Sequence, residues 1–392
     1  MNSLYKHIVN EIPLKLNEEQ RNRLLELDAE YGKLYKEWWY KWDRTDCKNL
    51  QEEFDKFIKA RNRGEKYYPQ LQLVRDDLDE SWLKEAERLR RKFEGFYCFL
   101  SRYYIENIDA MYIQADMTIH KNDPVALFRY NQLMVDRVSE EAYEYAWNLI
   151  KKHPYVDKRE DQPFRGPDVV SKMKSHMDKR GYRFEVKLNP YMIARQNVEP
   201  HNTTLHIKTD GYFSQLDVES LRIHEIDVHV ARRYYGLKLG LNLMVDGLLY
   251  RNELDEGLAI NQSLHHNKYG VKPNLEFDIA IKTIIGKHIM EMDFCELYDF
   301  LIDKVRTEQN KDIIESIVFK NICRFKRVLQ DSKLPGGDSR GETDYLLGYL
   351  QIHKMTDKER DDVLKWNIGP GQLQELPKIK EFFRLNKFKS LI

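Results

Sequence analysis

The chain has 392 residues, of which 42% are hydrophobic and 12% aromatic. This composition supports a large buried core and excludes a chain that is disordered throughout. The 64 basic and 64 acidic residues cancel, so the formal net charge is zero. Because proteins that coat nucleic acid are usually strongly basic, we expect no nucleic acid partner.

The sequence contains no signal for export or for membrane insertion. The first twenty residues lack the apolar segment of a secretory signal, and no run of about 18 uncharged apolar residues would span a membrane. The four cysteines are far apart and form no CxxC pair, which fits a reducing compartment. We therefore expect a cytoplasmic protein with no membrane span.

The first third of the chain is predicted to be helical. Apolar residues recur at helical spacing over residues 17–62, 80–108 and 123–153, with a break at Asn62-Arg63-Gly64. This part is rich in large aromatic residues, which we interpret as helix-packing core rather than as a platform for stacked bases. They are Trp38, Trp39, Trp42, Tyr103, Tyr104 and Tyr145.

A polar, proline-containing segment over residues 155–168 is typical of a linker between domains. The pattern of the sequence changes after it, from long helices to short strand-like runs. We therefore predict two parts: a helical N-terminal region over residues 1–154 and a second domain over residues 155–392.

The second domain is predicted to begin with a small sheet and a capped helix. Its first elements are a short helix over 169–180, closed by Gly181, and strands over 182–188, 192–198 and 204–209. Ser214-Gln-Leu-Asp217 is a capping box that opens a helix running to about Tyr235. From about residue 247 the pattern is mostly helical, so the predicted fold class is α+β and predominantly helical.

The capped helix carries the residues that point to chemistry. It contains His224-Glu225-Ile-Asp-Val-His229, and an acidic segment, Asn252-Glu-Leu-Asp-Glu-Gly-Leu-Ala259, follows. Two imidazoles and a carboxylate are the ligands of a catalytic zinc site, which leaves a fourth position for water. Zinc lowers the pKa of that water to about 7, and Glu225, beside one ligand, is placed to complete its deprotonation.

The spacing of the two histidines predicts a distorted helix. Zinc-binding histidines on a helix usually stand at i and i+4, about 40° apart around the axis. His224 and His229 stand at i and i+5, which is about 140° apart on a regular α-helix. Both bind one ion only if a π-bulge, with i→i+5 hydrogen bonds, brings them to a common face.

Several motifs resemble the microtubule-associated tyrosine carboxypeptidase family, whose bacterial members are often labelled flavohaemoglobin-expression-modulating QEGLA-motif proteins. The specific matches are Phe213 to Gly236, which holds the HExxxH motif, and Glu253 to Ala259, which resembles an EGLA box. Met192 to Val198, Arg327-Val328 and a YLxG box at Tyr345–Gly348 are similar too. The resemblance covers about residues 165–350 and implies a zincin-like catalytic domain with carboxypeptidase activity.

Carried over by the matching motifs, the resemblance implies zinc as the cofactor, with His224, His229 and Glu256 as ligands and Glu225 as the catalytic base. Glu253 is the rival third ligand, and the EGLA match selects Glu256. The sequence departs from the family at Asp255, where relatives more often have Gln, Thr or Glu. We expect this change to alter the hydrogen bonds around a ligand rather than the ligand set.

A carboxypeptidase needs two further groups, one for the oxyanion and one for the terminal carboxylate of the peptide. Tyr345 is the candidate oxyanion donor, and a packed tyrosine is the alternative. Arg327 is the first candidate for binding the carboxylate and Arg324 the second, although both also fit a basic surface cluster. The strand over 204–209 is predicted to be the sheet edge that pairs with an extended substrate.

The resulting hypothesis is a zinc peptidase that removes a C-terminal residue, with an aromatic residue as the known eukaryotic case, and whose partners are peptide or protein C-termini. The alternative is a non-catalytic, metal-binding regulatory or interaction protein with a zincin-like fold. Glu225 favours catalysis, since a structural metal site gains nothing from it. The basic, amphipathic tail Leu376–Ile392 is predicted to dock on the body of the protein rather than on an acidic partner or a membrane surface.

Overall fold

A computed structural model describes most of the chain. The described residues are 13–42, 47–74, 78–120, 123, 125, 138–156, 162–192, 195–199, 203–248, 251–266, 268, 270, 274–311, 313–326, 332–337 and 340–392. Helices dominate and the sheets are small, so the α+β, predominantly helical class is confirmed. Among the described residues, no helix has the length and apolar character that a membrane span needs.

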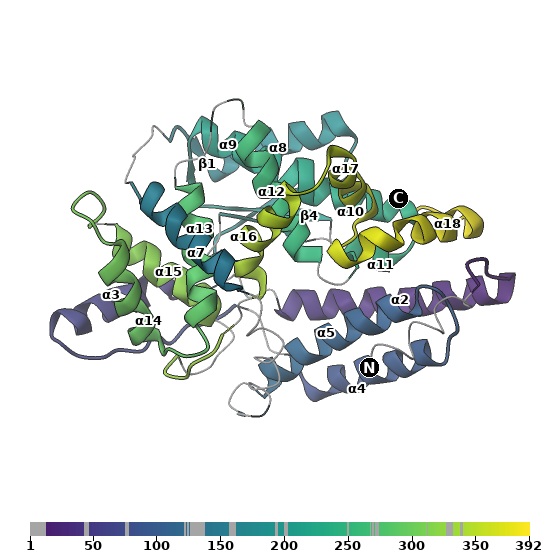
Figure 1. The fold of residues 1–392 in the computed structure, drawn as a ribbon, viewed down its shortest axis with the longest axis horizontal. Helices are drawn as coiled ribbons and strands as arrows, with labels where there is room; N and C mark the ends of the chain where they lie inside the picture. Colours follow the sequence, from purple (N-terminus) through teal and green to yellow (C-terminus); the bar gives the residue numbers. More distant parts are fainter. Residues whose placement is uncertain are drawn as a thin grey trace.

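The N-terminal helices are α2 (Glu18–Trp42), α3 (Leu50–Asn62), α4 (Glu80–Glu94), α5 (Ser101–Ile119) and α7 (Glu140–Lys152). The helices α2, α4 and α5 pack side by side, whereas α3 and α7 lie elsewhere, against helices of the second part of the chain (Figure 1). The stretch predicted as one helix over 80–108 is two, because the chain turns at Gly95 between α4 and α5. Much of the helix predicted over 123–153 lies outside the described residues.

The second part of the chain begins with the predicted sheet. Its elements are β1 (Phe164–Arg165), α8 (Gly166–Arg180), β2 (Glu185–Asn189), β3 (Gln196–Glu199), β4 (Thr204–Lys208) and β5 (Tyr212–Phe213). As predicted, α8 ends at Gly181, which adopts the left-handed conformation (φ 72°) that glycine enters without steric cost.

The strand order corrects one prediction. The three-stranded sheet has the order β2-β4-β3, with β4 parallel to β2 and antiparallel to β3. The strand predicted over 204–209 is therefore central rather than an edge, and both its sides are already hydrogen-bonded. Within the described part of the chain, β3 is the edge strand on one side of this sheet.

The remaining elements are helical. They are α9 (Gln215–Leu221), η1 (Arg222–Val230), α10 (Ala231–Leu239), α11 (Asn242–Asp246), α12 (Arg251–His266), α13 (Leu275–His288), α14 (Phe294–Val305), α15 (Ile314–Lys326), α16 (Arg340–His353), α17 (Asp357–Trp366), η2 (Pro370–Glu375) and α18 (Leu376–Asn386). The Ser214 capping box is present, with the side chains of Ser214 and Asp217 each accepting a backbone N–H from the other residue.

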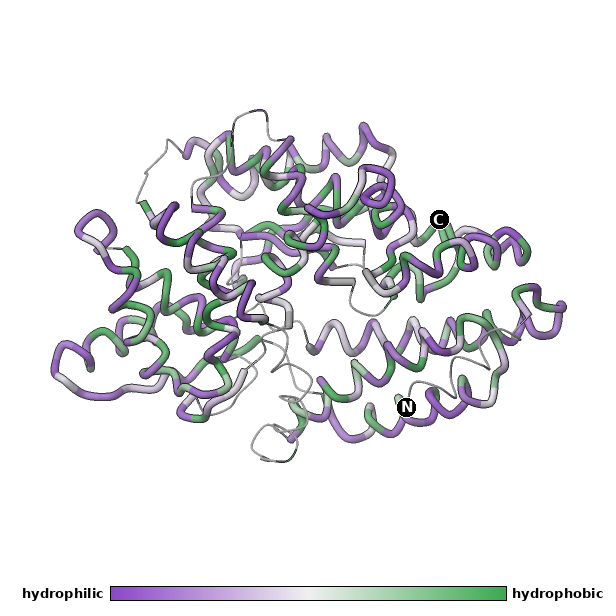
Figure 2. The backbone as a smooth tube through the Cα atoms, viewed as in Figure 1, coloured by the Kyte–Doolittle hydropathy of each residue, from purple (hydrophilic) through white to green (hydrophobic). Residues whose placement is uncertain are grey.

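Three large clusters of buried side chains hold these helices together. One joins α2, α4 and α5 to residues from η1 to α18, one joins α3 and α7 to α13–α16, and one lies between α8, the sheet and η1. Figure 2 shows hydrophilic and hydrophobic residues alternating along the N-terminal helices, as amphipathic helices require. The division into 1–154 and 155–392 stays a prediction.

The docking of the C-terminal tail is confirmed for its helical part. In α18, Ile379, Phe382 and Phe383 are buried, and Leu385 is half-buried. The aromatic residues of the N-terminal helices also behave largely as core. Trp38, Tyr103 and Tyr104 are buried, whereas Tyr145 is 38% exposed.

A buried carboxyl group ties three helices together. Asp28 of α2 accepts hydrogen bonds from the Tyr104 hydroxyl of α5 (2.7 Å) and from the backbone N–H groups of Asn242 (2.8 Å) and Leu243 (3.1 Å) in α11. Burial raises the pKa of Asp28 from 3.8 to about 6, against the opposing effect of these donors. Between pH 3.8 and about pH 6, the Asp28 carboxyl group is therefore mostly protonated in the folded protein and mostly ionised in the unfolded chain.

We predict that this group makes the stability of the protein depend on pH. Its contribution is present below pH 3.8 and is lost as the pH rises through about 6, because the folded state then holds a proton more tightly than the unfolded state. Relative to Asp28→Asn, the free energy of unfolding of the wild type should fall by about 2 kcal/mol between pH 4 and pH 7. Urea unfolding at several pH values measures this; Glu26→Gln, an exposed position of the same helix, is the control and should leave the pH dependence unchanged.

Candidate metal centre

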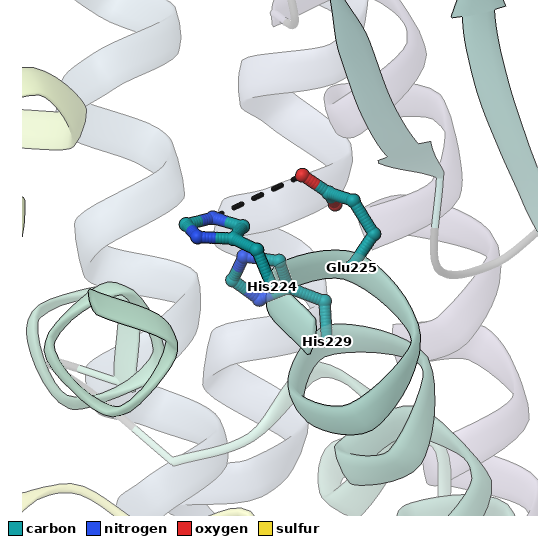
Figure 3. Close-up of side chains that lie close together, drawn as sticks. All are labelled: His224, Glu225 and His229. Atoms are coloured by element: carbon teal, nitrogen blue, oxygen red, sulfur yellow. Dashed lines mark ion pairs between the residues drawn. The ribbon is translucent and has the colours of Figure 1, made fainter. Parts of the chain in front are cut away.

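The helix that carries the two histidines is wound as predicted. Residues Arg222–Val230 form a π-helix, η1, between α9 and α10, so the i→i+5 pattern extends over nine residues rather than one bulge. The rings of His224 and His229 lie side by side, with centroids 4.8 Å apart. Figure 3 shows both rings on one side of this helix, with the Glu225 side chain beside them.

A carboxylate from a second helix meets both rings. Glu256 Oε2, on α12, lies 3.2 Å from Nε2 of His224 and 3.6 Å from Nε2 of His229. This oxygen is buried and accepts no hydrogen bond from the described residues in acceptable geometry. The structure thus brings together the three side chains that the sequence suggested as ligands, around an oxygen whose lone pairs are available to a cation.

Glu225 offers a second carboxylate to the same place. Its Oε1 lies 3.9 Å from Nε2 of His224, and the ligand atoms of His224, Glu225 and His229 all lie within 4.8 Å of one another. Proximity alone therefore admits either glutamate as third ligand. The shorter distances favour Glu256, because its one oxygen approaches both imidazoles, and this leaves Glu225 beside the site.

Asp255 contacts the His229 ring at Nδ1, the nitrogen that does not face Glu256. Its Oδ1 lies 2.9 Å from Nδ1 of His229 and 3.1 Å from Nε of Arg232, and its Oδ2 accepts a 2.6 Å hydrogen bond from Arg233. A carboxylate at Nδ1 fixes the ring orientation and leaves Nε2 for a metal. The sequence suggested this position for Asp255, but we did not anticipate the two arginines, although they follow His229 by three and four residues.

The charges of these groups are strongly coupled. Burial disfavours the charged form of His229, but the carboxylates of Asp255 and Glu256 outweigh it and raise the pKa of His229 to about 10. Burial alone would raise the pKa of Glu256, whereas the imidazoles of His229 and His224 hold it below the usual range. The site is thus built to hold positive charge between buried carboxylates, which a proton or a metal cation supplies.

Two glycines set the distance between the helices that complete the site. α12 and α16 pack against each other, and a Cβ on Gly257 would overlap the backbone of Gly348, just as a Cβ on Gly348 would overlap the carbonyl of Glu253. The glycines of the EGLA and YLxG boxes are therefore in mutual contact. Their close approach places Glu256 of α12 and Tyr345 of α16 at the same site.

Tyr345 and two cations line the cavity in front of the histidines, which has a volume of about 310 Å³. The Tyr345 ring stacks near His224, with centroids 6.4 Å apart, and Lys282 Nζ lies 3.9 Å from the centre of the Tyr345 ring. Arg324 Nε donates a 2.8 Å hydrogen bond to the buried Glu342, whose other oxygen lies 3.3 Å from Lys282 Nζ. Arg327, the first candidate for the carboxylate, lies outside the described residues.

Lys282 is a cavity residue that the sequence analysis missed. It lies on α13 within an apolar run, Ile-Ala-Ile-Lys282-Thr-Ile-Ile, and such an isolated lysine is the signal that could have identified it. Burial and the neighbouring Arg324 lower its pKa, and the carboxylates of Glu342 and Asp278 oppose this shift. Burial of the Tyr345 hydroxyl and the carboxylate of Glu256 raise the pKa of Tyr345 well above its usual value, so it remains a hydrogen-bond donor.

Comparison with known families supports the resemblance. A family model described as microtubule-associated tyrosine carboxypeptidase matches residues 100–386, which is well over half of the chain. The chain belongs to this family. A comparison with curated protein sequences gives no significant match. The matched region runs from α5 to α18 and so includes η1, α12 and α16.

The close contact between α12 and α16 leads to a specific prediction. Gly348→Ala should destabilise the protein by about 3 kcal/mol or more, because α12 and α16 must separate to admit the new methyl group. Gly341→Ala is the matched control: it lies on the same helix with no atom within 4 Å of an added Cβ, and should change stability by less than about 1 kcal/mol. Chemical unfolding of both variants measures the difference; equal effects would contradict the role of the contact.

Proposed function

We propose that the protein is a zinc-dependent carboxypeptidase with a zincin-like catalytic domain. The observation that supports this most is the approach of two Nε2 atoms to one buried oxygen of Glu256. Imidazole and carboxylate are the donors of catalytic zinc sites with three protein ligands. The small sheet that precedes the histidine helix supports the zincin-like part of the proposal.

His224, His229 and Glu256 would hold the metal, and the metal would supply Lewis acidity and a water of lowered pKa. The Glu225 carboxylate, beside His224, accepts the proton of the attacking water and passes it to the leaving amine. Tyr345 donates its hydroxyl proton to a hydrogen bond with the oxygen that becomes negative in the tetrahedral intermediate. Asp255 keeps the His229 ring in position throughout.

The position of the cations supports an exopeptidase. Lys282 and Arg324 lie on the cavity wall next to Tyr345, whose ring in turn lies next to His224. A terminal carboxylate bound in this cavity would need such a cation, because its burial unpaired would be costly. The apolar side chains of Ile260 and Ile279 line the same cavity and suit an apolar or aromatic terminal residue.

The substrate chain can reach this place along β3. Gln196, Asn197 and Val198 of this strand line the cavity, and an edge strand offers backbone hydrogen bonds to any extended peptide. We therefore propose that β3, rather than the central β4, pairs with the substrate. The substrate class is a flexible protein C-terminus, for which the family name suggests tyrosine; no residue of the site indicates tubulin in particular.

The first test separates metal binding from catalysis. Glu225→Gln should keep one zinc per chain but lose about 10²- to 10⁴-fold in kcat, because an amide cannot accept the proton of the water. His229→Ala should lose both the activity and the bound zinc. Glu253→Gln, one turn before Glu256 on α12, is the control and should keep both metal and activity.

Metal analysis of the purified variants and hydrolysis of C-terminal peptides measure these outcomes. Full activity of Glu225→Gln would contradict the catalytic mechanism and favour the alternative, a non-catalytic metal-binding regulatory protein. Loss of zinc in Glu253→Gln with retention in Glu256→Gln would instead identify Glu253 as the third ligand.

The second test addresses the terminal carboxylate. Lys282→Gln and Arg324→Gln should each lower kcat/KM for peptides with a free carboxylate by about 10- to 100-fold, since a hydrogen bond to a charged group contributes about 1.5–3 kcal/mol. Cleavage of the same peptides with a C-terminal amide, already slow, should change little. Lys320→Gln, on α15 like Arg324 but outside the cavity lining, is the control. Equal losses on both peptide types would show that these cations do not bind the carboxylate.

A further inference from the structure

The winding of η1 requires a stabilising interaction of its own. π-Helices are rare and usually only one turn long. A longer π-helix therefore needs interactions that make it more stable than an α-helix of the same residues. In an α-helix, His224 and His229 would stand about 140° apart and would not face one carboxylate. The proposed metal centre therefore depends on whatever holds residues 222–230 in the π-helical register.

A second pair of side chains in η1 has the same spacing as the histidines. Arg222 Nη1 donates a short hydrogen bond to Asp227 Oδ2, and the two residues are five positions apart. Side chains on an α-helix pair at spacings of three and four residues, not five. This ion pair therefore forms across the π-helical register, just as the contact between the two imidazole rings does.

The α-helical register would change the partner of Arg222. Its neighbours at i+3 and i+4 would be Glu225 and Ile226, so the guanidinium would pair with the proposed catalytic base. Asp227 would face Ile223 and His224 towards the N-terminus and Val230 and Ala231 towards the C-terminus, so no arginine or lysine would stand at these spacings. The π-helical register thus pairs both charges and keeps Glu225 beside His224.

Residues on both sides anchor this pair. Arg222 also donates two hydrogen bonds of 3.0 Å to Glu219, three residues earlier in α9, so its guanidinium spans the junction between α-helical and π-helical winding. Arg180, the last residue of α8, approaches Asp227 Oδ1 at 2.7 Å. The Arg222 and Asp227 side chains are only 16% and 21% exposed, which limits screening by salt.

We propose that Arg222, Asp227, Glu219 and Arg180 form a clamp that holds η1 in its π-helical register and so keeps His224 and His229 on one face. These are positioning residues, because none of them lies within the proposed ligand set. The inference rests on the proposed function in one respect: the consequence of the clamp for metal affinity presupposes that the two histidines bind zinc.

The first experiment compares two carboxylates of similar exposure. Asp227→Asn keeps the shape of the side chain and removes its charge; Asp362→Asn does the same to an aspartate of α17 that is 17% exposed and paired with Lys380 at 2.6 Å. Zinc affinity, measured by competition with a chelator, should fall about 10- to 100-fold in Asp227→Asn and less than about twofold in Asp362→Asn. Asp227→Glu, which restores the charge, should recover most of the affinity. An equal effect of Asp227→Asn and Asp362→Asn would overturn the proposal.

The second experiment needs no metal. In the metal-free full-length protein, hydrogen exchange of the backbone amides over residues 222–230 should be at least about tenfold faster in Asp227→Asn than in the wild type, because the register opens more often. The amides of α18 should be unchanged. Unchanged exchange over 222–230 overturns the clamp whatever the zinc result. Failure of the wild type to bind zinc, with the exchange difference present, would overturn the metal centre and leave the clamp.

Discussion

The candidate site depends on a single geometric constraint, which is that two imidazoles five residues apart must face the same side of one helix. A regular α-helix cannot satisfy it. The chain satisfies it with nine residues of π-helix between α9 and α10. The Ser214 capping box fixes where the whole helix begins, and the charged pair Arg222–Asp227 bridges the π-helical turn.

Two further helices, α12 and α16, supply the other side chains of the candidate site. α12 supplies Glu256 to the imidazoles and Asp255 to the far side of His229, while α16 supplies Tyr345. Gly257 and Gly348 bring the two backbones into contact, and this contact fixes the spacing between the helices that carry Glu256 and Tyr345. The two short motifs, EGLA and YLxG, therefore have the same structural role. Each contributes one side chain to the site and one glycine to the contact between the helices.

Much of this arrangement could be predicted from the sequence because its determinants are local. The capping box, the left-handed Gly181 and the required distortion between His224 and His229 all follow from residues within a few positions of one another. The determinants that escaped prediction are distant in the chain. β4 is central because it pairs with β2 in parallel, a register that no local pattern encodes. Lys282 reaches the cavity only because α13 packs against α16.

The placement of β3 has a consequence for which proteins can reach the site. An unpaired strand edge on a flat surface invites pairing with any exposed sheet, including that of another copy of the chain. Here Gln196 to Val198 of β3 line the cavity in front of the histidines rather than a flat surface. If β3 pairs with the substrate as proposed, the partner must present an extended chain to Gln196 to Val198, so a flexible chain end suits this position better than a folded surface does.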